Sequence, residues 1–140
     1  MASAADLQQA LTWPSSRLLG SEFVSWDAET GTAEMRFVAP PEFRNMRGTV
    51  QGGLVAGFLD EVLGCALWFA TGGKVQLTLD LNLSLLRPVP VGKLVGKARA
   101  VRAGSRVAFL DSELFTEDGT LVARATATSI PTDMKLGGEV

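Results

Sequence analysis

The sequence of 140 residues contains no histidine and only one cysteine, Cys65. Without an imidazole, a Ser-His-Asp or Cys-His nucleophile system is excluded, and so is any zinc site that needs a histidine ligand. A single cysteine also excludes an intramolecular disulfide and suits a reducing compartment. Cys65 stands among apolar residues, so we interpret it as a small core residue rather than a nucleophile. Chemistry must therefore depend on carboxylates, amides, hydroxyls and backbone N–H groups.

Strong net charge is also missing, since the formal charge is −2, and this argues against a general nucleic-acid binder. The length predicts one domain spanning residues 1–140. No basic cluster precedes an apolar run near Met1, so we expect no secretory signal and a cytoplasmic protein. The run Leu54–Ala70 has the length of a membrane span, but it contains Asp60 and Glu61, each unfavourable there by about 2.5–3.5 kcal/mol. A transmembrane helix is therefore rejected.

The same run is the centre of the sequence. Its apolar residues recur at helical spacing from Val55 to Phe69, between the pair Gly52-Gly53 and the stop signal Gly72-Gly73. We predict a buried helix that begins at a glycine turn. Asp60 lies on one stripe of this helix with Gly57 and Gly64, so its carboxylate is expected to face a crevice or a partner. Glycine within a helix costs about 1 kcal/mol relative to alanine, so this stripe needs a reason such as a close ligand.

The remaining segments predict strands, apart from a short N-terminal helix over residues 4–11 that we interpret as a flap or cover. Alternation and turn signals predict a hairpin of 23–26 with 32–38, and a meander of four strands over 75–87, 94–103, 106–116 and 121–130. The tail from about 132 to 140 is expected to be loose. One long apolar helix with an antiparallel sheet predicts an α+β protein whose sheet wraps the helix.

Several motifs occur together in this order. They are Asn45-x-x-Gly48-x-x-Gln51-Gly52-Gly53 with Asp60, the stretch Thr78-Leu-Asp-Leu-Asn-Leu-Ser-Leu-Leu-Arg87-Pro88 with Gly92, Gly104-Ser105-Arg106, and Asp118-Gly119-x-Leu121-Val122-Ala123. With them, residues 38–128 resemble the hotdog-fold acyl-CoA thioesterases of the PaaI-like (phenylacetic acid degradation) family. The resemblance implies a hotdog fold and hydrolysis of an acyl-CoA thioester. It also implies homodimers with active sites between the subunits, commonly paired into homotetramers.

Residue by residue, the resemblance places the catalytic carboxylate at Asp60 and the N–H that polarises the thioester at Gly52 or Gly53. It assigns supporting polar roles to three residues, Asn45, Gln51 and Thr78. The family usually has histidine where this chain has Gln51, and glutamine can donate a hydrogen bond but cannot carry charge or shuttle a proton. Asn45 and Gln51 can equally serve only to form the turn.

Thioester hydrolysis develops negative charge on the carbonyl oxygen, and the unpaired N–H groups of a helix N-terminus are suited to stabilise it. The alternative is that Gly52 and Gly53 merely permit a tight turn. Seven residues separate Gly53 from Asp60, about 10 Å along one helix, so a two-fold dimer is needed to bring both groups to one carbonyl. Asp60 can act as general base or as nucleophile. Glu61 points about 100° away and is a fallback for that role; otherwise it forms an ion pair with an arginine such as Arg47.

Basic residues gather between Arg87 and Arg106 without any acid. We take Arg102 and Arg106, then Arg87 and Lys93, as candidates for the CoA phosphates, although solvated strand faces explain such residues equally well. Because CoA is part of the substrate, no separate cofactor is expected, and no metal. We interpret the aromatic residues as core or dimer contacts rather than a dedicated acyl pocket, and Phe43 and Trp68 are the first candidates if one of them lines such a pocket.

The sequence thus predicts a cytoplasmic thioesterase for aryl- or medium-chain acyl-CoA. The alternative is a non-catalytic acyl-CoA-binding hotdog protein, which the missing histidine favours. An enoyl-thioester hydratase on the same fold is disfavoured because such enzymes usually pair a histidine with the acid.

Overall fold

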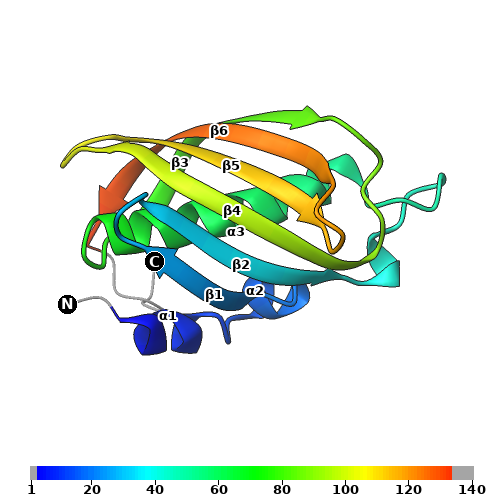
Figure 1. The fold of residues 1–140 in the computed structure, drawn as a ribbon, viewed down its shortest axis with the longest axis horizontal. Coiled ribbons are helices and arrows are strands. Elements are labelled where there is room, and N and C mark those ends of the chain that lie inside the picture. The colour runs from blue at the N-terminus through cyan, green and yellow to red at the C-terminus, as the bar shows by residue number, and fades with distance from the viewer. Residues whose placement is uncertain (1–2, 134–140) are drawn as a thin grey trace.

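The structure, a computed structural model, describes residues 3–133. The helical elements are α1 (Ala4–Ala10), α2 (Pro14–Leu18), the 3-10 helix η1 (Pro41–Phe43) and α3 (Gly52–Ala70). The strands are β1 (Glu22–Asp27), β2 (Thr32–Ala39), β3 (Val75–Leu85), β4 (Gly92–Ala103), β5 (Ala108–Thr116) and β6 (Leu121–Thr132). All six strands form one antiparallel sheet in the order β1-β2-β4-β5-β6-β3. The sheet curves around α3, and α1 and α2 lie beside β1 (Figure 1).

The long central helix is confirmed. It begins after Gln51, whose extended backbone (φ −56°, ψ 133°) forms the N-cap, and it ends at Thr71. Gly72 follows with a φ of 72°, a conformation that glycine adopts without strain. By length and composition α3 could cross a membrane. In this fold α3 is instead a core helix, since the sheet surrounds it and many of its side chains are buried. This agrees with the rejection of a membrane span on account of Asp60 and Glu61.

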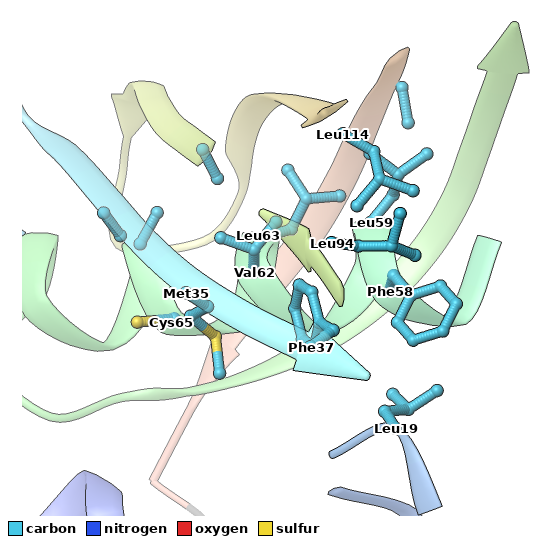
Figure 2. Close-up of a cluster of buried hydrophobic side chains, with 14 of the residues drawn as sticks. Leu19, Met35, Phe37, Phe58, Leu59, Val62, Leu63, Cys65, Leu94 and Leu114 are labelled. Atoms are coloured by element: carbon cyan, nitrogen blue, oxygen red, sulfur yellow. The ribbon is translucent and has the colours of Figure 1, made fainter. Parts of the chain in front are cut away.

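The core lies between α3 and the concave face of the sheet. Figure 2 shows its members gathered from both layers, among them Phe37, Phe58, Leu59, Leu63, Leu94 and Leu114. Gly96 of β4 permits close packing of α3, because a Cβ there would lie 3.3 Å from Val62 Cγ1 of the helix and 2.8 Å from Phe37 Cε2 of β2. The helix can therefore sit deep in the curved sheet.

The predicted meander of four consecutive strands is wrong in one respect. Strand β3 does not pair with β4; it pairs with β6 and forms an edge of the sheet, while β4 pairs with β2 and β5. The connection 86–91 contains Pro88 and Pro90, which cannot donate ladder hydrogen bonds and so favour a crossover rather than a hairpin. It passes the start of α3, where the Val50 N–H donates to the Val89 carbonyl at 2.8 Å. Alternation predicted the strands but not their order.

Strand β3 leaves part of its apolar surface exposed. Leu77, Leu79 and Leu85 are 51%, 57% and 53% exposed, while Leu81 and Leu83 are partly buried against the core. A register shift between Thr78 and Asp80 interrupts the alternation, so the single buried face of leucines expected for this strand is not formed. The other differences are small. The helix α2, with Pro14 at its start, was not predicted, and β6 continues to Thr132 rather than ending near 130. The loose tail was predicted for about 132–140, and residues 134–140 lie outside the described residues.

Candidate active site

The glycine turn, residues 45–53, leads into the start of α3, and the side chain of Asn45 stabilises its first part. The side-chain Oδ1 of Asn45 accepts hydrogen bonds from the backbone N–H groups of Arg47 (2.9 Å) and Thr49 (3.3 Å). Gly48 within this turn has a φ of 81°. The Oδ1 of Asn45 therefore has a turn-forming role, which was one of its two predicted interpretations.

The first N–H groups of α3 are available to a ligand. Those of Gly52 and Gly53 have no hydrogen-bond acceptor among the described residues. A Cβ at Gly53 would meet nothing within 4 Å, so this N–H is approachable. Gln51 is exposed, and its side chain makes no cap hydrogen bond to the helix. The turn thus presents two donors at the positive end of the helix dipole, where an oxyanion is stabilised.

The carboxylate of Asp60 faces β3. Its Oδ1 accepts hydrogen bonds from Thr78 Oγ1 at 2.8 Å and from Gln76 Nε2 at 3.2 Å. The buried Ser129 of β6 in turn donates to Gln76 Oε1 at 3.1 Å. Oδ2 has no hydrogen-bond partner within residues 3–133. One oxygen is therefore fixed by β3, and the other can meet water or a substrate.

Sequence reasoning identified Asp60 and Thr78 but missed Gln76 and Ser129. A signal for Gln76 was present, since it stands two residues before Thr78 and so on the same face of a strand. Ser129 gave no such signal, because it meets this group only through the pairing of β6 with β3.

The neighbouring acid Glu61 faces the N-terminal segment. It accepts hydrogen bonds from Ser16 Oγ (3.0 Å) and Ser21 Oγ (3.3 Å). The predicted ion pair with Arg47 is wrong, because these two serines occupy the carboxylate. Burial raises the pKa of Glu61, and the two serine hydrogen bonds oppose that rise. Burial also raises the pKa of the Cys65 thiol to about 12, so Cys65 has the predicted character of an unreactive core residue.

Two cavities flank α3. One of about 420 Å³ is lined by Asp60, Glu61 and Trp68, and one of about 530 Å³ by Asn45, Gly52 and Arg87 among others. Asp60 and Gly53 are seven residues apart on the helix, or about 10 Å. A single chain therefore does not bring the carboxylate and the glycine donors into one cavity.

The two aromatic residues named as pocket candidates lie in different places. Trp68 lines the cavity that contains Asp60. Phe43 instead packs against Phe58 in the core, with ring centroids 6.1 Å apart. Phe43 is therefore a core residue in this chain and does not line the cavity at Asp60.

The predicted phosphate residues also fall into two groups. Arg87 and Lys93 flank the connection near the glycine turn, while Arg102 and Arg106 lie at the other end of β4 and beyond it. Nine residues of strand separate Lys93 from Arg102, about 30 Å, so one chain does not present all four to one ligand. Arg47, which was not a phosphate candidate, lines the glycine-turn cavity with Arg87.

The positive run along β4 is offset by neighbouring strands. Arg99 lies opposite Asp111, and Lys97 lies opposite Glu113. Lys97 also approaches Glu34 at 3.8 Å. The sequence showed the basic residues of β4 together but could not show which acids the sheet places beside them.

Comparison with known proteins places this chain in a family. Residues 47–123 match the thioesterase superfamily. A phenylacetic acid degradation-related protein from Ralstonia eutropha JMP134 is 38% identical, with a TM-score of 0.78 over 89% of this chain and 98% of that one. Human acyl-coenzyme A thioesterase 13 is 29% identical over 89 residues, a match that spans 62% of this chain and 64% of the human protein.

The fold is shared more widely. A Streptococcus mutans protein, smu.793, is 22% identical with a TM-score of 0.70, over 80% of this chain and 88% of that one. The wrapped helix, the family match and the Ralstonia relative agree with the resemblance drawn from the motifs. This chain belongs to the thioesterase superfamily and is a thioester hydrolase with the hotdog fold.

Proposed function

We propose that this enzyme hydrolyses aryl- or medium-chain acyl-CoA in the cytoplasm, with Asp60 as the catalytic carboxylate. The observation that carries the proposal is the state of Asp60, whose Oδ1 is fixed by Thr78 and Gln76 while Oδ2 has no partner in the described chain. CoA as the thiol component is supported by two similar proteins, the human acyl-coenzyme A thioesterase 13 and the Streptococcus mutans protein whose structure has acetyl-CoA bound.

In this mechanism the thioester carbonyl oxygen accepts a hydrogen bond from the N–H of Gly53 or Gly52. As general base, Asp60 takes a proton from water, whose oxygen adds to the carbonyl carbon. The C–S bond then breaks, and the CoA thiolate receives the proton. As nucleophile, Asp60 attacks the carbonyl carbon, and the C–S bond breaks with release of the CoA thiolate. Water then hydrolyses the mixed anhydride to the free acid and the Asp60 carboxylate, and the proton that water loses goes to the thiolate. Gln51, exposed beside these donors, can add a hydrogen bond to the carbonyl but cannot move a proton.

We further propose a homodimer in which Asp60 of one subunit meets the glycine turn of the other. The exposed leucines of β3 support this, because a long apolar edge strand is a ready surface for pairing with a second copy. The separation of the two cavities along α3 supports it as well. Two such dimers would form the proposed homotetramer.

The phosphates of CoA are assigned to Arg47 and Arg87 beside the glycine turn. The Arg87 guanidinium is already oriented, since its Nη1 donates to the Leu121 carbonyl at 2.6 Å. Arg87→Ala should raise KM for acyl-CoA about ten-fold, in the range of one charge-assisted hydrogen bond. The test compares it with Arg106→Ala at the far end of the sheet. Equal increases in KM would remove the special role of Arg87.

The activity itself is tested by release of free CoA from a panel of phenylacetyl-, benzoyl- and C4 to C12 acyl-CoA. The expected result is turnover by the parent and loss of turnover in Asp60→Ala. Saturable binding of these esters without CoA release would instead support the non-catalytic acyl-CoA-binding alternative. Equal turnover by Asp60→Ala and the parent would refute the role of Asp60.

The shared site is tested by mixing subunits. Asp60→Ala removes the carboxylate, and Gly53→Pro removes one donor N–H at a helical position where proline is tolerated. Each homodimer should lose most of its activity, yet the mixed dimer contains one intact site. Random mixing in equal amounts should restore about a quarter of the parent activity. No restoration, with mixed dimers verified by native mass spectrometry, would place the site within one chain.

A further inference from the structure

The cavity at Asp60 is enclosed by the N-terminal arm, which we define as residues 3–21 and which contains α1 and α2. This cavity of about 420 Å³ lies between the arm and one face of α3. Leu7, Leu11 and Leu19 line it from the arm and are largely buried. Cavities of this size and apolar character are those in which proteins enclose small ligands.

The cavity extends along the helix from the catalytic carboxylate. Asp60, Gly64 and Trp68 all line it and follow one another at intervals of four residues on α3. Eight residues of helix correspond to about 12 Å. Asp60 therefore stands near one end of the helical lining, with Gly57 one turn before it, and Trp68 stands at the other end.

The glycines of the helix keep this space open. A Cβ at Gly64 would lie 3.7 Å from Gln76 Nε2, and one at Gly57 would lie 3.5 Å from Leu19 Cδ2. Both glycines line the cavity, so a larger side chain at either position would occupy part of it. This accounts for two residues that otherwise weaken a helix by about 1 kcal/mol each.

The charges around the cavity disfavour an anionic occupant. Asp60 and Glu61 are both in its wall. Lys74 is there as well, but it is engaged in an ion pair with Asp133. A carboxylate on the acyl group would be repelled by these two acids, whereas an uncharged hydrocarbon group would gain from burial.

The arm is fixed directly beside this wall. Ser16 of α2 and Ser21 after it both donate to Glu61, so the roof of the cavity is tied to the helix that forms its floor. The cavity at the glycine turn differs, because Arg47, Arg87 and Asn45 line it and suit the polar part of a CoA ester.

We propose that the cavity under the N-terminal arm is the acyl pocket, that it selects uncharged aryl or medium-chain acyl groups, and that Gly64 and Leu7 set the length accepted. The acyl group enters past Asp60 and extends toward Trp68, while the CoA portion lies at the glycine turn of the partner subunit. This inference rests on the proposed thioesterase function for the position of the thioester, but its test does not require turnover.

The test uses two series of ligands. The first is the saturated acyl-CoA esters from C2 to C12, measured as kcat/KM. The second is the matching S-alkyl-CoA thioethers, which cannot be hydrolysed, measured as Kd by titration calorimetry. In the parent, affinity should rise about four-fold for each added methylene until the pocket is full. Succinyl-CoA should have a kcat/KM at least ten-fold below that of butyryl-CoA, which has the same number of acyl carbons, by like-charge repulsion.

Two variants change the length of the pocket in opposite directions. Gly64→Leu should move the plateau of both series to shorter chains, lowering affinity for the C10 thioether at least ten-fold while sparing C2. Leu7→Ala removes a side chain from the roof and should move the plateau to longer chains. Ala70→Leu is the matched control, since it adds the same side chain to an exposed site at the end of α3, outside the cavity.

The outcomes separate the two proposals. Thioether binding that rises with length and shifts in Gly64→Leu, without hydrolysis of any ester, would support the pocket and refute the thioesterase proposal. Hydrolysis with identical length profiles in the parent, Gly64→Leu and Leu7→Ala would support the thioesterase and overturn the pocket. Equal kcat/KM for succinyl-CoA and butyryl-CoA would overturn the proposed exclusion of charged acyl groups. Circular dichroism and the unchanged binding of C2 exclude unfolding as the cause of a shift.

Discussion

Asp60 and Glu61 are adjacent in the sequence, yet they belong to two different regions of the molecule. Asp60 faces β3, where two donors hold one of its oxygens and leave the other without a partner in the described chain. Glu61 faces the N-terminal arm, where two serine hydroxyls donate to its two oxygens and burial raises its pKa. A rotation of about 100° around the helix thus separates an acid suited to chemistry from one that ties two elements together.

The largest effect on kcat should come from replacing one of the two acids, Asp60, by its amide. Asp60→Asn should lower kcat about 100-fold to 10,000-fold, the usual contribution of a general base. Glu61→Gln keeps the shape of the side chain and should leave kcat within a few-fold of the parent, because Glu61 lies off the reacting face. The measurement is CoA release at saturating substrate. If Glu61→Gln loses as much activity as Asp60→Asn, the two acids share the chemistry and the contrast between them is wrong.

A smaller loss is expected when the support of Asp60 is weakened. Gln76→Leu removes one of the two donors to Oδ1, and a hydrogen bond to a charged group is worth about 1.5–3 kcal/mol when fully lost. We expect kcat to fall about ten-fold with little change in KM, since Gln76 positions the carboxylate rather than touching the substrate.

Ser129→Ala and Ser112→Ala form a matched pair of variants that tests whether the orientation of Gln76 matters for activity. Both serines are buried, but Ser129 donates to Gln76, whereas Ser112 Oγ has no hydrogen-bond partner among the described residues. Only Ser129→Ala should lower kcat. A loss in Ser112→Ala of the same size would show that activity responds to general packing and not to the orientation of Gln76.

The smallest effect concerns stability and its pH dependence. Because the pKa of Glu61 is raised above its ordinary value of 4.5, the folded state binds more protons than the unfolded state once the pH exceeds that value. The contribution of Glu61 to stability therefore falls as pH rises through the raised pKa. Glu61→Gln does not titrate, so its Tm relative to the parent should increase from pH 4 to pH 8. A difference in Tm that stays constant over this range would contradict the raised pKa.

The contrast between the two acids also shows what the sequence could reveal. Helical spacing located α3, and its glycine stripe correctly indicated that Asp60 faces a space rather than a filled core. The partner of Glu61 was not predictable, because Ser16 and Ser21 carry no motif and meet Glu61 only after the arm folds back over the helix.

The order of the strands in the sheet could not be predicted for a related reason. Local alternation defines a strand and its two faces, but the neighbours of that strand depend on the whole sheet. The sequence therefore predicted strand β3, whose Thr78 contacts Asp60, but it could not show that β3 pairs with β6 and so brings Ser129 to Gln76. The split of the basic residues between two ends of the sheet follows from the length of β4, and the predicted strand over 94–103 already implied it.

Strand β3 combines two features that are usually separate. It is the exposed edge of the sheet, and it also carries both side chains that orient Asp60. If two copies associate through this edge, any fraying of the strand on dissociation would release the carboxylate from its donors. Specific activity would then depend on the concentration of the enzyme itself. Dilution would free Asp60 from its donors and lower the activity before the protein unfolds.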